Sequence, residues 1–159
     1  MTDKNTTPIL SVAKKKDLDL VLKLVRAFHK AEGIDVSNST LTNTVYPLLK
    51  KQNEHGCVLL INLGTDVIGY VALCFGYSIE FGGRDASIDE LYLKNEYQGK
   101  KIARSVLADC KSLANGLGLQ ALHINVSSSA SKLRSLYEDC GFSVRAPYAT
   151  MSAQLGAKT

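Results

Sequence analysis

Two adjacent carboxylates and a basic turn that contains a glycine are the groups in this sequence best suited to chemistry. Asp89 and Glu90 come first, and the turn at residues 94–101 follows them with Gly99 inside it. A helical pattern opens after the turn, and the first amides of a helix lack intrahelical partners, so they attract anions. The cationic side chains at this end are Lys100, Lys101 and Arg104. The stretch therefore predicts a site for a phosphate or pyrophosphate group.

A strand must lead into this turn and a helix must leave it. Residues 88–93 are mostly apolar or aromatic, which favours a strand on a pleated surface. After the turn, apolar side chains recur at helical spacing, which predicts an amphipathic helix. The members of that apolar stripe are Ile102, Val106, Cys110 and Leu113. Taken alone, the stretch also fits an ordinary strand, turn and helix with solvated lysines.

The remaining patterns predict a mixed α/β fold in one domain. A helix begins at Asp17 with Gly33 just past its end, Pro47 interrupts the next helical pattern, and Gly141 stops a last helix that starts near residue 130. The other predicted strands are at residues 9–12, 57–63, 67–78, 121–126, 142–144 and 148–155. This order implies a mostly antiparallel sheet of about 6–7 strands with a central parallel pair, flanked by about 4 helices. We assign residues 1–7 to a disordered tail and residues 8–156 to the domain.

Composition excludes several classes of protein. The chain has 159 residues, of which 45% are hydrophobic and 21% charged, with a formal net charge of +4. No apolar run approaches the ~20 residues of a membrane helix, and the N-terminus lacks the apolar core of a signal peptide. The only dense basic run, residues 14–16, has no interleaved aromatic residues, which argues against nucleic-acid binding. We therefore expect a cytoplasmic protein that binds neither a membrane nor nucleic acid.

The cysteines and histidines do not suggest a metal centre. The four cysteines are widely separated in apolar patterns, with no spacing suited to zinc. They are Cys57, Cys74, Cys110 and Cys140. We expect core thiols in a reducing compartment. Of the histidines, His55 suits a loop and His123 a structural position on a strand.

Two short patterns resemble the GCN5-related N-acetyltransferase (GNAT) superfamily. Residues 98–103, Gln-Gly-Lys-Lys-Ile-Ala, resemble the acetyl-CoA pyrophosphate loop of that family, Gln/Arg-x-x-Gly-x-Gly/Ala, with Lys101 where the family usually has glycine. Residues 137–142 read Tyr-Glu-Asp-Cys-Gly-Phe, and the family commonly has Tyr-Glu-x-x-Gly-Phe. The predicted order of elements also agrees with the order in the family. Residues 88–93 look most like the diamine and aminoglycoside acetyltransferase branches.

The resemblance implies an acetyl-CoA site around the turn. The loop amides would wrap the pyrophosphate, and the main chain at residues 91–93 would bind the pantetheine arm where two strands splay apart. The cofactor-binding residues implied in this way are Leu91, Tyr92, Leu93, Gln98, Gly99, Lys100, Lys101, Ile102, Ala103, Arg104 and Asn125. The asparagine that often contacts the cofactor in the family corresponds to Ala130, and Asn125 is a nearby asparagine in this chain.

The same resemblance implies catalytic roles for a tyrosine and a carboxylate. Tyr137 corresponds to the general acid for the departing thiolate, with a core aromatic residue as the alternative. Asp89 and Glu90 are candidates for holding the amine and relaying its proton through water. Adjacent strand residues point to opposite faces, so we expect only one to face the cleft, and the family favours Asp89. Alternatively, both carboxylates cap the strand or pair with Arg84 or Lys94.

The acceptor side is expected at the end of the first helix and on the hairpin opposite. The substrate-binding candidates there are Phe28, His29, Glu32, Tyr77, Glu80 and Asp85. Carboxylates beside aromatic rings suit a cationic amine. We therefore predict an acetyl-CoA-dependent N-acetyltransferase that acts on a primary amine of a small cationic molecule, by direct attack in a ternary complex. The alternatives are a protein acetyltransferase, acting at a lysine or an N-terminus, and a non-catalytic acyl-CoA-binding domain. By resemblance the chain forms a homodimer.

Overall fold

A computed structural model describes residues 7–156 of the chain. Its contacts divide the chain into two compact units, Met1–Asn125 and Val126–Thr159, and each is described by itself. The tail expected at residues 1–7 lies outside the described residues except for Thr7, which is exposed and belongs to no helix or strand. Between residues 7 and 156, no helix has both the length and the hydrophobicity that crossing a lipid bilayer requires.

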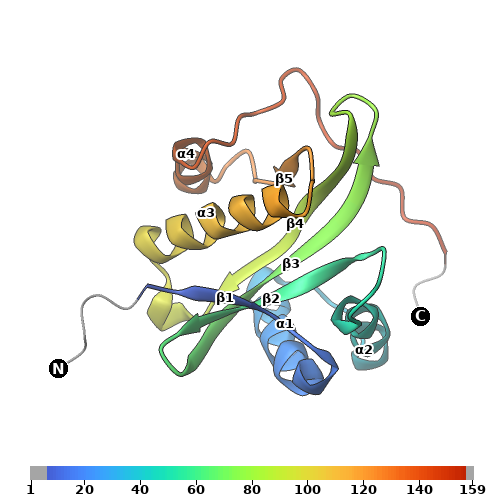
Figure 1. Cartoon of the computed structure of the whole chain (residues 1–159), viewed down its shortest axis with the longest axis vertical. Helices are drawn as coiled ribbons and strands as arrows, with labels where there is room; N and C mark the ends of the chain where they lie inside the picture. The colour runs from blue at the N-terminus through green and yellow to red at the C-terminus, as the bar shows by residue number, and fades with distance from the viewer. Residues whose placement is uncertain (1–6, 157–159) are drawn as a thin grey trace. The chain divides into compact units, whose positions relative to one another are not determined.

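The first unit is built on a five-stranded sheet, shown in Figure 1. In spatial order, which is also the chain order, the strands are β1 Ile9–Val12, β2 Gly56–Leu63, β3 Asp66–Ser78, β4 Gly83–Leu93 and β5 Leu122–Ile124. Neighbouring strands are antiparallel, except that β4 and β5 are parallel. The prediction of a mixed α/β fold with one parallel pair is confirmed.

Helices cover both faces of this sheet. The α-helices described in the first unit are α1 Leu18–Glu32, α2 Asn38–Val45 and α3 Lys100–Gly116. Figure 1 shows α1 and α2 on one face and α3 on the other. As predicted, α1 ends where Gly33 takes a left-handed φ of 68°, which glycine adopts without strain. Also as predicted, the helical pattern changes near Pro47, where the 3-10 turn Tyr46–Leu49 follows α2.

Each face of the sheet has its own hydrophobic core. Alternate residues of β2 and β3 pack against α1, α2 and the 3-10 turn. The buried members of this first core are Ala13, Val21, Leu22, Leu24, Val25, Leu41, Val45, Leu49, Val58, Leu60, Tyr70 and Ala72. On the other face, Ala114 of α3 packs with Ala86 of β4 and with Leu119. Because burying one large apolar side chain contributes about 1.5–3 kcal/mol, the alternation in β2 and β3 holds α1 and α2 against one face.

One extra residue in β4 changes the direction of its side chains. Ala72 of β3 lies opposite Glu90, and the next residue of β3, Leu73, lies opposite Ile88, so Asp89 is left without a partner in β3. Such a β-bulge interrupts the alternation of a strand. Glu90 therefore lies on the same face as Ala72, towards α1 and α2, whereas Ile88 lies on the opposite face with Leu73.

The strand β4 extends beyond its parallel partner. The last described pair joins Ile88 to Ile124, where β5 ends, while β4 continues to Leu93. Within the described part of the chain, residues 89–93 therefore have no strand beside them on the β5 side. This open edge lies where the sequence predicts the parallel pair to splay.

The second unit contains the helix α4, Ser131–Asp139. The strands predicted at residues 142–144 and 148–155 are wrong, because residues 142–156 are in no strand. Their large apolar side chains are exposed, namely Val144, Tyr148, Met151 and Leu155. Strand-forming side chains make a strand only where a neighbouring edge supplies hydrogen bonds, and residues 142–156 pair with no such edge. The described sheet therefore has five strands rather than about 6–7.

Candidate functional site

A pocket of about 110 Å³ opens on the face of the sheet that α1 and α2 cover. Its apolar wall is formed by Val25, Leu41, Val45, Leu48, Val58 and Ala72. Its polar lining is formed by His29, Thr44, Tyr70, Asp89 and Glu90. The pocket thus joins two carboxylates of β4 to an aliphatic wall that comes largely from α1, α2 and the turn after it.

Both carboxylates line this pocket, whereas the sequence predicted that only one of them faces the substrate cleft. The prediction assumed strict alternation along the strand, which the bulge at Asp89 removes. The two side chains differ in their surroundings, because Asp89 is exposed and Glu90 is half-buried. Among the residues that the structure describes, Asp89 has no hydrogen-bond or ion-pair partner.

The carboxylate of Glu90 is held by two other side chains of the pocket. Nε2 of His29 lies 2.5 Å from Oε2 of Glu90, and the hydroxyl of Tyr70 donates to Oε1 at 3.0 Å. Both oxygens accept a hydrogen bond when His29 carries a proton on Nε2. Nδ1 of His29 is buried without a partner among the described residues. Glu90 is therefore fixed in place, whereas Asp89 is available to a ligand.

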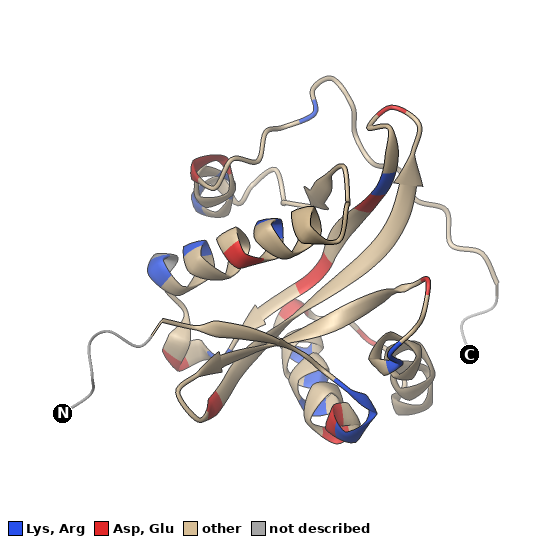
Figure 2. Ribbon diagram, in the orientation of Figure 1, with Lys and Arg blue, Asp and Glu red and all other residues tan. Residues whose placement is uncertain are grey.

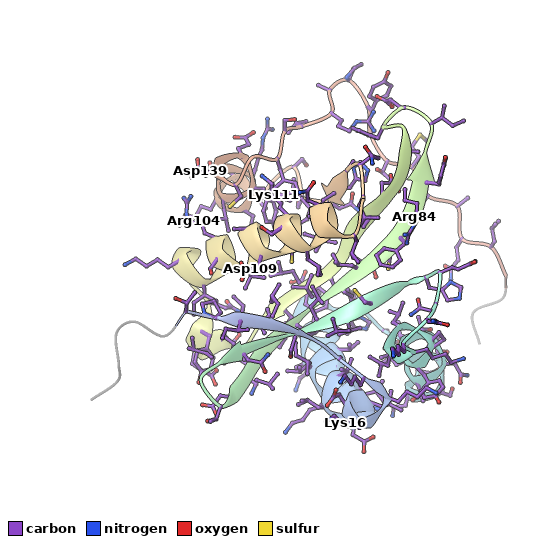
Figure 3. The ribbon with its side chains drawn as sticks, viewed as in Figure 1. Lys16, Arg84, Arg104, Asp109, Lys111 and Asp139 are labelled. Carbon is purple, nitrogen blue, oxygen red and sulfur yellow. The ribbon has the colours of Figure 1, made fainter. Side chains whose placement is uncertain are left out.

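The alternative partners considered for these carboxylates lie elsewhere. Figure 3 shows Arg84 on β4, and its guanidinium lies 5.1 Å from the centre of the Phe75 ring. Among the described residues, Lys94 makes no ion pair with Asp89 or Glu90. The hydrogen bonds of Glu90 go instead to α1 and β3, which supports a role at the pocket rather than at the end of the strand.

Tyr70, which donates to Glu90, belongs to a cluster of aromatic rings. The ring of Phe28 lies 6.4 Å from that of Tyr70 and 6.1 Å from that of Tyr92. Burial raises the pKa of the Tyr70 phenol well above its ordinary value, and the negative charge of Glu90 adds to the shift. The phenol therefore keeps its proton and remains a donor to Glu90 at any physiological pH.

On the other side of β4, the start of α3 is open. The amide of Ala103 donates to the carbonyl of Gly99, so the amides of residues 100–102 have no intrahelical acceptor. A Cβ on Gly99 would have no atom within 4 Å, which leaves room in front of the helix. Figure 2 shows basic residues at this end of α3 and acidic residues along β4. Free amides, open space and positive charge fit a pyrophosphate group.

The side chains of the predicted pyrophosphate loop take different directions. Gln98 ties the loop to the strand, because its amide donates to the carbonyl of Leu93 at 3.1 Å and to Oδ1 of Asn95 at 3.2 Å. Lys101 is exposed, so its side chain need not fill the space in front of the helix. Figure 3 shows Arg104 on α3. The side chain of Lys100 lies outside what the structure describes.

The other cofactor candidates are placed by the register of β4. Glu90 and Tyr92 share the pocket face, so Leu91 and Leu93 point to the opposite face, and only their main chain borders the open edge. Ile102 and Ala103 are half-buried in the first turns of α3. Asn125 is exposed and follows β5 directly, whereas the sequence predicted it inside that strand.

One acceptor candidate lines the pocket, a second lies beside that residue, and the other four lie elsewhere. His29 lines it, and the ring of Phe28 lies 5.8 Å from that of His29. The four outside are Glu32, Tyr77, Glu80 and Asp85. Glu32 is the exposed last residue of α1, Tyr77 is 76% exposed, and Glu80 lies in the exposed turn between β3 and β4. Oδ2 of Asp85 lies 3.0 Å from Nε2 of His123.

Tyr137 belongs to the second unit and lies on α4. Its ring is 6.2 Å from that of Phe142, whose amide donates to the Tyr137 carbonyl at 3.0 Å. Burial raises the pKa of the Tyr137 phenol above its ordinary value. The phenol thus holds its proton at neutral pH, as a general acid must before it donates.

Sequence reasoning missed Tyr70 and the aliphatic wall. The signal for Tyr70 was present, since it is a tyrosine within the apolar run of β3, where a buried hydroxyl requires a partner. Thr44 and Leu48 carried no such signal, because their place at the pocket depends on how α2 packs. The same is true of the bulge at Asp89.

The described residues were also compared with what metal binding and thiol chemistry require. Within residues 7–156, no group of three or more His, Cys, Asp or Glu side chains is placed to hold a metal ion. The four cysteines are free thiols. Burial raises the pKa of Cys57 to about 11 and that of Cys110 to about 12, so both stay protonated at neutral pH. Protonated thiols are poor nucleophiles.

Comparison with known proteins gives a family and a fold. The sequence model of the Acetyltransferase (GNAT) family matches residues 22–142, which is most of the chain and includes β4, α3 and α4. A comparison with curated protein sequences gives no match.

Several solved structures share the fold. An integron cassette protein from the mobile metagenome of Cole Harbour Salt Marsh has a TM-score of 0.79 at 22% identity, covering 94% of this chain and 92% of that one. An aminoglycoside acetyltransferase from an uncultured soil metagenomic sample, in complex with sisomicin, has a TM-score of 0.75 at 12% identity, covering 94% and 97%. A ribosomal-protein-alanine N-acetyltransferase from Brucella melitensis biovar Abortus 2308 has a TM-score of 0.71 at 17% identity, covering 94% and 99%.

Proposed function

This chain belongs to the acetyltransferase (GNAT) family, and on that premise we propose that it transfers the acetyl group of acetyl-CoA to a primary amine of a small cationic molecule. The observation that carries the proposal is the arrangement of β4. Its open edge at residues 89–93 borders the side expected for the donor, and its bulge turns Asp89 and Glu90 into the pocket proposed for the acceptor. One strand thus serves both substrates.

On the donor side, we assign binding mainly to the main chain. The free amides of residues 100–102 would hold the pyrophosphate, and Lys101 and Arg104 would add positive charge near it. The open edge of β4 would hydrogen-bond the pantetheine arm. Acetyl-CoA, when bound, supplies an acetyl group activated as a thioester. Positioning by these groups lets the amine attack directly, without a covalent enzyme intermediate.

On the acceptor side, we assign Asp89 to the substrate ammonium and Glu90 to the support of the site. Asp89 is the exposed carboxylate without a described partner. It can therefore hold the substrate ammonium group and relay the proton of that ammonium group to water. Glu90 keeps both oxygens on His29 and Tyr70, which fixes β4 against α1. Tyr137, protonated at neutral pH, would give a proton to the departing thiolate.

A small acceptor is favoured over a protein. The pocket, of about 110 Å³, is smaller than the roughly 300–1,000 Å³ of typical ligand sites. The neighbours in fold include both an aminoglycoside acetyltransferase and a ribosomal-protein-alanine N-acetyltransferase, so the fold alone does not choose between these classes. The small pocket beside a carboxylate supports the first class.

We also propose that the enzyme acts in the cytoplasm as a homodimer. The four free thiols agree with a reducing compartment. Apolar side chains near the C-terminus, such as Met151 at 93% and Leu155 at 91% exposure, are candidates for burial against a second copy. Light scattering on the purified protein tests the dimer, and a monomer mass at micromolar concentration contradicts it.

A thiol-release assay tests the proposed activity. The protein is incubated with acetyl-CoA and with each member of a panel of alkylamines, polyamines, aminosugars, amino acids and peptides, and free coenzyme A is measured against a blank without amine. We expect release that depends on a small amine and that falls in the Asp89→Asn variant. Acetyl-CoA binding without release in any arm would leave an acyl-CoA-binding domain, and release only with peptides would indicate a protein acetyltransferase.

A further inference from the structure

We propose that the acceptor carries a single ammonium group next to an apolar group, rather than several charges or hydroxyls. The inference rests on the proposed acetyl transfer and names the class of amine that the pocket selects. It is carried by one juxtaposition, in which a carboxylate without a described partner, Asp89, borders a pocket with a mainly aliphatic wall.

The charges of the pocket are largely accounted for by its own side chains. Glu90 accepts from Tyr70 through Oε1 and lies against His29 through Oε2, so each of its oxygens already has a partner within the protein. Asp89 is therefore the one carboxylate among the described lining residues that has no hydrogen-bond or ion-pair partner of its own. A second ammonium group on the same acceptor would have to compete with His29 and Tyr70 for Glu90, and breaking that network in a partly buried site is unfavourable.

The wall of the pocket offers few hydrogen bonds to a polar acceptor. Leu41, Val45 and Leu48 line it from α2 and the turn that follows, and Val58 and Ala72 line it from the sheet. An aminosugar would bury its hydroxyl groups against these side chains and lose hydrogen bonds to water. An alkyl group instead gains from removal of its surface from water.

Thr44, the polar residue of α2 at the pocket, adds little to the hydrogen bonds that the wall can offer an acceptor. Its hydroxyl donates to the carbonyl of Thr40 at 2.7 Å, so its proton is used within the helix. The size of the pocket, about 110 Å³, also limits the apolar group to a short chain. The chemistry that fits is a small aliphatic primary amine with one positive charge.

Two amines with the same carbon chain distinguish an acceptor with one positive charge from an acceptor with two. Butylamine and 1,4-diaminobutane have the same carbon chain and differ by one ammonium group. In the thiol-release assay with acetyl-CoA, we expect kcat/KM for butylamine to exceed that for 1,4-diaminobutane by at least tenfold. Glucosamine is expected to be as poor an acceptor as the diamine.

A charge placed in the wall should weaken this preference. The Thr44→Asp substitution puts a second carboxylate at the pocket, and we expect the ratio of the two kcat/KM values to fall about tenfold towards the diamine. Thr42→Asp is the matched control, since Thr42 lies on the same helix, donates to the Asn38 carbonyl at 2.9 Å and does not line the pocket. This control should keep the wild-type ratio, and thermal melts of both variants establish that they fold.

The possible results distinguish the inference about the acceptor from the acetyl-transfer activity on which it depends. Equal or better turnover of 1,4-diaminobutane by the wild type overturns the single-charge acceptor and leaves acetyl transfer standing. The same ratio of the two kcat/KM values in the Thr44→Asp and Thr42→Asp variants also overturns it, because a charge in the wall of the pocket then has no effect on which amine is preferred. No release of coenzyme A with any amine overturns the proposed activity, and the inference with it.

Discussion

The proposed donor side and the proposed acceptor side of this molecule are assembled from different parts of the chain. The donor side runs continuously from the open edge of β4 through the turn to the first amides of α3, and it uses mostly main-chain groups. The acceptor pocket gathers side chains from α1, α2, β2, β3 and β4. Both sides meet at β4.

This difference predicts how each side responds to mutation. We expect a main-chain site to tolerate a change of side chain as long as the backbone keeps its path, and Lys101 in place of the glycine usual in the family is one such change. A side-chain site loses function with a single substitution, because each group has one position and one partner. Substitutions on each side test this difference between a main-chain site and a side-chain site.

The largest effect is expected from Tyr137, which belongs to neither side. Tyr137→Phe removes the proposed proton donor, and general acid catalysis contributes roughly a hundredfold to ten-thousandfold. We expect kcat to fall within that range, while the dissociation constant of acetyl-CoA changes less than about threefold. Stopped-flow or steady-state turnover and calorimetry measure the two quantities. Tyr148→Phe, at an exposed tyrosine of the same unit, is the control. Parallel losses in turnover and affinity would reassign Tyr137 to packing.

The next effect tests the acceptor side through Asp89. Asp89→Asn replaces the carboxylate proposed to hold the ammonium group by a neutral group of the same shape. A hydrogen bond to a charged group contributes about 1.5–3 kcal/mol, so we expect kcat/KM for the amine to fall about 10- to 100-fold. The affinity for acetyl-CoA should not change. Asp66→Asn, in the exposed turn between β2 and β3, controls for net charge. An unchanged kcat/KM would remove Asp89 from the acceptor site.

A smaller effect tests the donor side through the main chain at residue 100. Lys100→Pro deletes the first free amide of α3, and proline is tolerated at this position because the preceding Gly99 is extended, with ψ of 152°. We expect the dissociation constant of acetyl-CoA to rise roughly tenfold. Lys100→Ala removes the charge and keeps the amide, so its effect should be roughly threefold. Equal effects of the two variants would mean that the side chain, rather than the main chain, carries binding here.

The smallest effect concerns the support of Glu90. Tyr70→Phe removes the hydrogen bond to Oε1 and should lower the free energy of unfolding by about 1 kcal/mol at pH 7. Tyr92→Phe is the matched control, because Tyr92 lies directly opposite Tyr70 in the sheet. Urea denaturation of the three proteins measures the difference. A larger loss in the Tyr92 variant would contradict the assigned network.

The same variants give a test by pH. The pKa of Tyr70 is raised in the folded state, so the unfolded chain releases this proton first as the pH rises above the ordinary phenol pKa of about 10. The contribution of Tyr70 to the free energy of unfolding should therefore be constant below pH 10 and fall above it. The Tyr70→Phe variant lacks this term, so the gap between it and the wild type should narrow as the pH rises. A constant gap would contradict the shift.

Much of the fold followed from local patterns. The end of α1 at Gly33, the change of helix near Pro47 and the strand, turn and helix around Gly99 are each set by residues close together in sequence. The strands predicted after Gly141 failed, because residues 142–156 have strand-type side chains without a partner edge. A local pattern shows which secondary structure a residue favours, but a strand also needs a neighbouring strand, which comes from elsewhere in the chain.

The amino-acid sequence by itself determined the family and the parallel pair beside α3, and it predicted a place for the donor, because these depend on contiguous residues and on main-chain geometry. Only the tertiary structure decided which side chains line the pocket proposed for the acceptor. The bulge that turns Asp89 and Glu90 to one face arises from the register between β3 and β4, and the pairing of Glu90 with His29 joins residues 61 positions apart. Such contacts depend on how distant elements pack, and no local pattern encodes them.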